Sequence, residues 1–149
     1  MVTTVGTEST YEKLLRNLLL LEHDAIAAYE QTIQRLDNKA WAQQIAAFKA
    51  DHDRHVQELT QLAGTAGAEA PMEGDAKQLL TTGKVAMASI MGDAATLRAM
   101  KSNEEDTVSA YERASQHSAA PAEALQIFKR AHEDELRHRA WMQETASAA

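Results

Sequence analysis

The sequence predicts an all-α protein, a four-helix bundle made of two helical hairpins joined by a long crossover. The chain of 149 residues is rich in Ala, Leu, Gln and Glu and has only two Pro and six Gly, a composition typical of long helices. Its apolar residues recur at alternating steps of three and four, as on a helix with one buried face. Turn residues divide the chain into two pairs of long helices, which is the pattern of a bundle with one crossover.

Each predicted element begins and ends at a residue with a physical reason. Ser9 and Glu12 form a capping-box pattern that begins the first helix, and Asn38 can cap the second. Gly64 ends the second helix, and Pro121 restarts the chain in the first turn of the last one. The predicted single domain over residues 1–149 contains a tail over 1–9, helices over 9–36 and 39–63, a crossover over 64–92 with an extra helix at 75–91, and helices over 93–116 and 121–145.

Charge and composition exclude several classes of function. The net charge is −7 and no Lys/Arg cluster exceeds a pair, which argues against a nucleic-acid or membrane-surface partner. The absence of Cys excludes thiol catalysis and Fe–S clusters. Residues 1–9 lack the apolar core of a signal peptide, so the sequence predicts a cytoplasmic location. The longest apolar run, Leu18 to Leu21, is too short to span a bilayer and predicts burial by the crossover helix or by the second subunit of a homodimer.

A repeat on the first and third helices indicates a buried polar site. Glu22 precedes Tyr29 by seven residues, and Glu104 precedes Tyr111 by the same spacing. Seven residues are two helical turns, so each Glu shares one helix face with its Tyr. On both helices that face is the apolar one, and a buried carboxylate is costly unless a partner compensates its charge. Each Glu therefore needs a partner in the core.

The second and fourth helices supply candidate partners for these carboxylates. Aligning Phe48 with Phe128 gives three candidate ligands on each helix at steps of three residues. The candidates are His52, His55 and Glu58 on the second helix and His132, Glu135 and His138 on the fourth. Carboxylates and neutral imidazoles gathered in an apolar bundle suit a pair of first-row transition ions, because the carboxylates offset the ionic charge and the imidazoles supply nitrogen ligands.

These spacings resemble the ferritin-like superfamily of di-iron carboxylate proteins, and more narrowly its small bacterial members of unassigned function, some proposed to act in stress responses. The resemblance covers residues 14–142 apart from the crossover. It implies that Glu22 and Glu104 are terminal carboxylates, Glu135 a bridging carboxylate and His138 a terminal imidazole. It also implies that the two tyrosines, Tyr29 and Tyr111, contact the ligands, that iron or manganese is the cofactor, and that ferroxidase or peroxide chemistry is the activity.

The second helix departs from the pattern of that family. Where the family has Glu-x-x-His, the aligned positions read His55-x-x-Glu58, and a slide by one turn gives His52-x-x-His55 with no Glu. Either register removes one bridging carboxylate, which favours occupancy by one ion or by zinc. Three functions therefore remain open: a di-metal protein of iron or manganese, a bundle that holds a single ion such as zinc without catalysis, and a metal-free bundle whose His/Glu layer is satisfied internally.

Overall fold

The computed structural model describes residues 2–71 and 91–149, and within these ranges it contains four α-helices and no strand. This architecture confirms the predicted all-α four-helix bundle. The predicted extra helix over 75–91 falls almost entirely outside the described residues. The helices are α1 (Tyr11–Arg35), α2 (Lys39–Ala66), α4 (Asp93–Ala114) and α5 (Ala122–Ala148).

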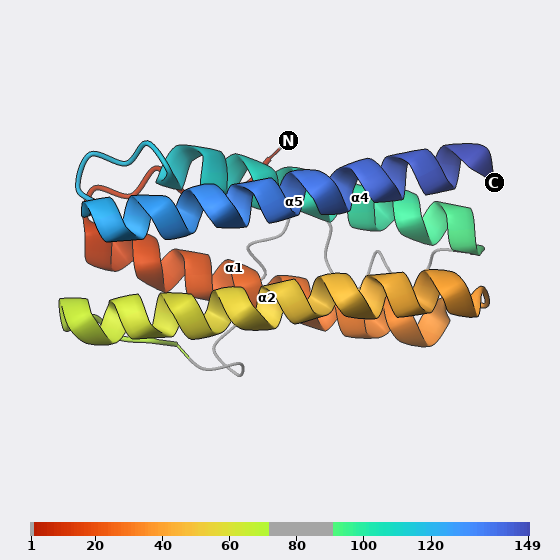
Figure 1. The fold of residues 1–149 in the computed structure, drawn as a ribbon, viewed down its shortest axis with the longest axis horizontal. Coiled ribbons are helices and arrows are strands. Elements are labelled where there is room, and N and C mark those ends of the chain that lie inside the picture. Colours follow the sequence, from red (N-terminus) through yellow and green to blue (C-terminus); the bar gives the residue numbers. More distant parts are fainter. Residues whose placement is uncertain (1, 72–90) are drawn as a thin grey trace.

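The helices form two antiparallel hairpins that lie against each other (Figure 1). The closest packing lies within the hairpins, between α1 and α2 and between α4 and α5. Because α2 ends and α4 begins at opposite ends of the bundle, α4 runs parallel to α2 and antiparallel to α1. The Asp93 carboxylate at the start of α4 accepts hydrogen bonds from the backbone N–H groups of Asp37 (3.0 Å) and Asn38 (2.8 Å), which ties the turn of the first hairpin to the second.

The helix ends differ from the predicted ones in local detail. Thr10, one residue after Ser9, caps α1 by accepting a hydrogen bond from the backbone N–H of Lys13. Asn38 caps α2 as predicted. Gly64 lies inside α2, which continues to a left-handed cap at Gly67 with φ +67°. A helical Gly costs only about 1 kcal/mol, which the packing of neighbouring turns outweighs here.

The N-terminal segment is docked on the bundle, although the sequence predicts only a polar tail. The backbone N–H of Thr3 donates to Asp106 Oδ1 at 2.8 Å, and Arg113 Nη1 donates to the carbonyl oxygens of Thr3 (2.6 Å) and Val5 (3.1 Å). Gly6 has φ +105°, and a Cβ atom at this position would lie 2.5 Å from the Cβ of Arg113. A glycine is therefore required where the segment crosses α4.

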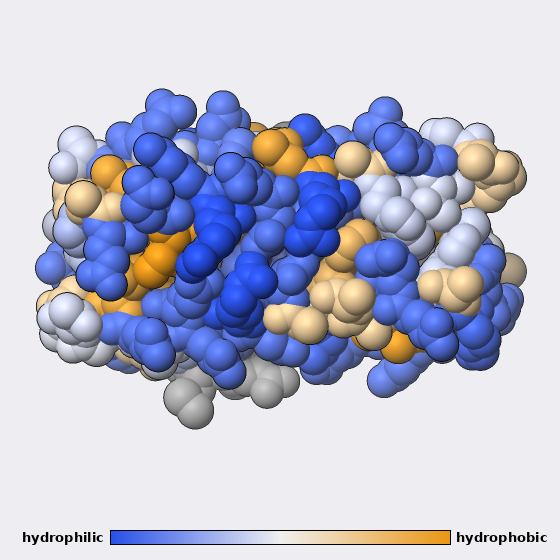
Figure 2. Space-filling model, viewed as in Figure 1, coloured by the Kyte–Doolittle hydropathy of each residue, from blue (hydrophilic) through white to orange (hydrophobic). Residues whose placement is uncertain are grey.

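The core consists of the apolar faces of all four helices. The Leu18 to Leu21 run is buried within one chain, and the homodimer stays a prediction. Among the described helices, none is long and apolar enough to cross a membrane. Figure 2 shows that the face over α2 and α5 is hydrophilic at its centre. The core contains six buried ionisable side chains of the candidate site: Glu22, His52, His55, Glu104, Glu135 and His138.

Candidate metal centre

Two overlapping groups of buried His and Glu side chains lie at the middle of the bundle. One group joins Glu22, His52, His55 and Glu135, and the other joins His52, Glu104, Glu135 and His138. Within each group the ligand atoms lie within 4.8 Å of one another, so each group could hold one metal ion. His52 and Glu135 belong to both groups. Each group draws its residues from three helices and from both hairpins.

In the first group, the two imidazoles of α2 face the same carboxylate. His52 Nδ1 lies 2.7 Å from Glu22 Oε2, and His55 Nδ1 lies 3.0 Å from Glu22 Oε1. These are hydrogen-bond distances. His55 Nδ1 also lies 3.4 Å from Glu135 Oε1. Glu22 is thus the centre of the first group and holds both imidazoles.

In the second group, the nitrogens and oxygens lie farther apart. His52 Nε2 lies 3.6 Å from Glu104 Oε1 and 3.5 Å from Glu135 Oε2. His138 Nδ1 lies 3.8 Å from Glu104 Oε2 and 3.6 Å from Glu135 Oε2. Metal–ligand bonds of about 2.0–2.2 Å place neighbouring ligands about 3.0 Å apart at octahedral angles and about 3.4 Å apart at tetrahedral angles. The spacing of the second group therefore resembles that of a four-coordinate ion.

Two polar atoms of these groups have no hydrogen-bond partner. They are His52 Nε2 and Glu135 Oε1, both on side chains that are fully buried. Buried polar atoms are paired in the great majority of cases, so each unpaired atom needs a physical reason. A metal ion in the second group would give His52 Nε2 a partner, and one in the first group would do so for Glu135 Oε1, which lies 3.4 Å from His55 Nδ1. The mixed nitrogen and oxygen ligands suit first-row transition ions.

The residues around these groups orient the carboxylates. Tyr111 Oη donates to Glu22 Oε1 at 2.6 Å, and Tyr29 Oη donates to Glu104 Oε1. Burial and the adjacent carboxylates raise the pKa of both tyrosines, so both stay protonated donors. Thr107 Oγ1 lies 3.0 Å from Glu104 Oε2 and 2.8 Å from Glu135 Oε2. Thr107 therefore joins the site, although the sequence carries no signal for this contact.

A ring of charged residues covers the site between α2 and α5. His138 Nε2 donates to Asp51 Oδ2 at 2.7 Å, and His55 Nε2 donates to Asp134 Oδ2 at 2.9 Å. Arg137 lies 2.9 Å from Asp51 and 3.1 Å from Asp134, and Arg54 also contacts both carboxylates. Each imidazole is therefore held by the Asp of the opposite helix, with its Nδ1 facing the core. Carboxylates in this position orient a ligating imidazole and raise its basicity.

The pairs of His55 with Asp134 and of His138 with Asp51 show which residues of α2 and α5 correspond. Asp51, His52, Arg54 and His55 correspond to Asp134, Glu135, Arg137 and His138 with one constant spacing. The predicted alignment of Phe48 with Phe128 therefore differs from this correspondence by one helical turn. His52 is the counterpart of Glu135, and His55 is the counterpart of His138. This is the His52-x-x-His55 register, in which α2 has no Glu.

This difference of one turn explains why two predicted candidates lie outside both groups. Glu58 is half-buried at the surface, where it accepts a hydrogen bond from Arg130 and lies 3.4 Å from Arg54 Nε. His132 is half-buried on α5 and belongs to neither group. Asp134 lies beside the site, because it accepts a hydrogen bond from His55 Nε2. The repeated Asp-x-x-Arg-His spacing at 51–55 and 134–138 is the signal that could have identified both aspartates.

The buried imidazoles hold their protons strongly. Burial alone would lower the pKa of His55 and His138. The charge of Glu22 and the hydrogen bonds with Asp134 and Glu22 together outweigh burial and raise the pKa of His55 to about 9. The adjacent carboxylates of Glu104 and Glu135 together outweigh burial and raise the pKa of His138 to about 10. An ion that binds either Nδ1 atom must therefore displace a proton at neutral pH.

The three carboxylates divide into two kinds. Burial would raise the pKa of Glu22, but the charges of His52 and His55 outweigh it and hold this pKa well below its usual range. Burial would also raise the pKa of Glu104, but its contacts with Glu135, His138 and His52 outweigh burial and lower this pKa. Burial and the negative charge of Glu104 raise the pKa of Glu135 to about 7. Glu135 is therefore the carboxyl group of the centre that takes up a proton most readily.

Metal-free protein should lose stability as the pH rises from about 6.5 to about 10. The native pKa values of His55 and His138, about 9 and about 10, lie above the ordinary value of 6.5. The stabilisation from their protons is therefore complete below pH 6.5 and is lost as the pH rises through the native values. Urea unfolding with a chelator at pH 6.5 and pH 10 measures this decline. The His55→Asn variant should decline less, and a parent protein equally stable at both pH values would contradict the prediction.

Asp51→Asn should weaken metal binding about 10- to 100-fold, because His138 Nε2 then loses its charged acceptor. Asp53→Asn is the matched control, since Asp53 lies two residues away on the same helix and makes a surface pair with Lys49 at 3.2 Å. Competition with a chelating dye measures both affinities. Equal affinities in the two variants would show that the carboxylate of Asp51 does not orient the imidazole.

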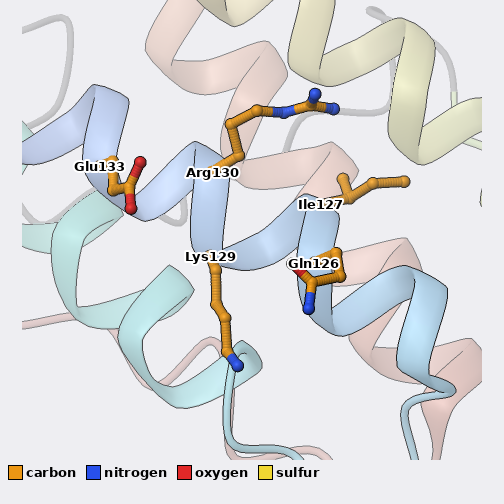
Figure 3. Close-up of a pocket in the computed structure, with 5 residues that line it drawn as sticks. All are labelled: Gln126, Ile127, Lys129, Arg130 and Glu133. Atoms are coloured by element: carbon orange, nitrogen blue, oxygen red, sulfur yellow. The ribbon is translucent and has the colours of Figure 1, made fainter.

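A shallow surface pocket on α5 lies apart from the buried His and Glu groups. It is lined by Gln126, Ile127, Lys129, Arg130 and Glu133 (Figure 3). Its side chains project outward from one helix, and none of them belongs to either buried group. In the part of the chain that the structure describes, the candidate chemistry is therefore concentrated in the bundle core.

One comparison with known proteins identifies a family. The family model described as "Domain of unknown function (DUF2383)" matches residues 10–117, which include α1, α2 and α4. No curated protein and no solved structure matches the chain. The matched region contains Glu22, His52, His55 and Glu104, and the remaining members of the two groups lie on α5.

Proposed function

The chain belongs to the DUF2383 family, and we propose that it is a ferritin-like metal-binding protein whose buried centre binds iron or manganese. The observation that carries the proposal is the pair of four-residue His/Glu groups, which share His52 and Glu135 at the middle of the bundle. The unpaired His52 Nε2 and Glu135 Oε1 atoms support it, because an ion in the group that each atom faces would supply its missing partner.

The charge of the site limits how many ions it can hold. The two groups together contain three carboxylates, and their three imidazoles must be neutral in order to bind metal. One divalent ion therefore leaves a net negative charge in the core, and two leave a net positive one. Both totals are close to neutral, which a buried site requires. The charge thus supports one or two ions and no larger cluster.

Iron would supply the redox chemistry of the proposed activity, the oxidation of Fe(II) with dioxygen or peroxide as the electron acceptor. The chain's own contribution is to bind and orient the ion and to exclude water from it. The ligand side chains of both groups are at most 2% exposed. Tyr29, Tyr111 and Thr107 donate hydrogen bonds to the carboxylates and hold them in place. A role in resistance to iron or peroxide stress would follow from this activity.

Metal analysis and an oxidation assay test this proposal. Purified protein should contain iron or manganese, or should bind Fe(II) anaerobically, and Fe(II)-loaded protein should develop near-ultraviolet absorbance on exposure to air. Chelation should lower the melting temperature, since an ion that binds only the native state stabilises it by mass action. Glu58→Gln, outside both groups, is the control and should behave like the parent. Protein that binds no metal and melts identically with and without chelator would contradict the proposal.

A second candidate function is a bundle that holds one zinc ion without catalysis. The nitrogen of His52 in place of a carboxylate favours it, because the second group then offers two nitrogen and two oxygen ligands, a set that suits zinc. Metal-bound protein that leaves Fe(II) unoxidised would support this candidate. The metal-free polar layer is favoured by the hydrogen bonds of Glu22 with His52 and His55, and the absence of any bound metal would support it.

A further inference from the structure

The two nitrogens of His52 face different surroundings. Nδ1 lies 2.7 Å from Glu22 Oε2, an ordinary hydrogen-bond distance. Nε2 has no hydrogen-bond partner and lies 3.5–3.6 Å from one oxygen each of Glu135 and Glu104. The ring is fully buried, so neither nitrogen reaches solvent. The two faces of this imidazole are therefore suited to different tasks.

The two groups that His52 joins differ in the same way, with short contacts in the first group and longer contacts in the second. In the first group, the contacts of Glu22 with His52 and His55 are 2.7 Å and 3.0 Å long, so protons already occupy the space between the atoms. In the second group, the four nitrogen–oxygen contacts measure 3.5–3.8 Å. This range is too long for strong hydrogen bonds and close to the edges of a tetrahedral metal site.

We propose that one transition ion binds preferentially in the second group, to His52 Nε2, His138 Nδ1, Glu104 and Glu135, and that Glu22 positions His52 there without binding the ion. This inference rests on the proposed metal-binding function. A neutral imidazole that binds metal through Nε2 keeps its proton on Nδ1, and Glu22 Oε2 accepts that proton at 2.7 Å. Carboxylate, imidazole and metal in this order are a common way to fix the orientation of a ligand.

His52 consequently sets the number of ions. A second ion between Glu22, His55 and Glu135 needs a further ligand, and on the α2 side that ligand is His52 Nδ1. If His52 Nδ1 bound this ion, the imidazole would lose its last ring proton to solvent, and its hydrogen bond with Glu22 would break. A carboxylate at this position, like Glu135 at the matching position of α5, could give one oxygen to each ion. The exchange of Glu for His therefore favours a single ion, and Glu22 departs from the terminal-ligand role that the family resemblance implies.

Titration of the full-length protein with Co(II) tests the inference, because the visible spectrum of Co(II) reports its ligands. The parent should bind one equivalent tightly. Glu22→Gln should bind one equivalent with an unchanged spectrum and an affinity reduced about 10- to 100-fold, since Gln can still accept from His52. Glu104→Gln should lose more affinity and shift the spectrum. His52→Glu should bind two equivalents.

Other outcomes separate this inference from the function on which it rests. Two tight equivalents in the parent, or a shifted spectrum in Glu22→Gln with an unshifted one in Glu104→Gln, would overturn the inference and leave metal binding intact. One equivalent in a folded His52→Glu variant would also overturn it. A parent that binds no Co(II), Fe(II) or Zn(II) would overturn both. If His52→Glu does not fold, the pair of Gln variants still decides, because both preserve side-chain size.

Discussion

Glu135→Gln is expected to lower the affinity for metal by more than about 100-fold. Glu135 is the carboxylate shared by both groups, with Oε2 facing the second group and Oε1 lying 3.4 Å from His55 in the first. Loss of a partner that only orients a ligand costs about 10- to 100-fold, so loss of a shared ligand should cost more. The substitution preserves size, and the amide can still accept from Thr107.

The matched control for this prediction is Glu133→Gln, which makes the same chemical change on the exposed face of α5. Competition with a chelating dye, with Zn(II) or Co(II) as the ion, gives both affinities. The control should equal the parent. Similar affinities for Glu135→Gln and Glu133→Gln would show that the shared carboxylate does not bind metal, even though it lies at the junction of the two groups.

Glu22→Ala should lower the free energy of unfolding of metal-free protein by about 3–5 kcal/mol, the typical cost of removing one partner from a buried ion pair. Glu22 is 1% exposed and accepts hydrogen bonds from His52, His55 and Tyr111. Its removal leaves two buried imidazoles that must either remain charged without this partner or lose their protons. It also leaves the Tyr111 hydroxyl without its acceptor.

Urea unfolding at pH 6 in the presence of chelator measures this loss. Glu30→Ala is the control on the same helix, because Glu30 is half-exposed and lies 3.9 Å from Lys49. Exposed pairs of this kind contribute about 0–1 kcal/mol. A loss below about 1 kcal/mol in Glu22→Ala would mean that the metal-free core does not depend on the Glu22 ion pairs.

The helices and the depth of the acidic residues could be predicted from the sequence because one-dimensional patterns determine both. Glu22 and Glu104 replace apolar residues on the buried faces of their helices, and the seven-residue spacing to Tyr29 and Tyr111 is a property of one helix alone. Both carboxylates are buried, and each accepts a hydrogen bond from the tyrosine of the other hairpin. That exchange between hairpins has no sequence signal, because it depends on how the hairpins dock.

The register of α2 against α5 could not be predicted for the same reason. The similarity of Phe48 and Phe128 suggests one alignment, whereas crossed ion pairs between the helices establish another, one turn away. Residues one turn apart share a helix face, so hydrophobic periodicity cannot distinguish these registers. The error moved Glu58 and His132 into the predicted site. It also assigned the exchange of Glu for His to His55, whereas the structure places it at His52.

The crossed contacts between the hairpins have a consequence for the kinetics of folding. Each hairpin can form through contacts that are local in sequence, whereas every four-residue group needs both hairpins in place. We expect the contacts between the hairpins to form after the folding transition state, and an ion bound to such a group would stabilise these contacts. It would therefore slow unfolding and leave the folding rate almost unchanged. In a cell, such an ion would raise the kinetic stability of the protein and lengthen the lifetime of its native state against proteolysis.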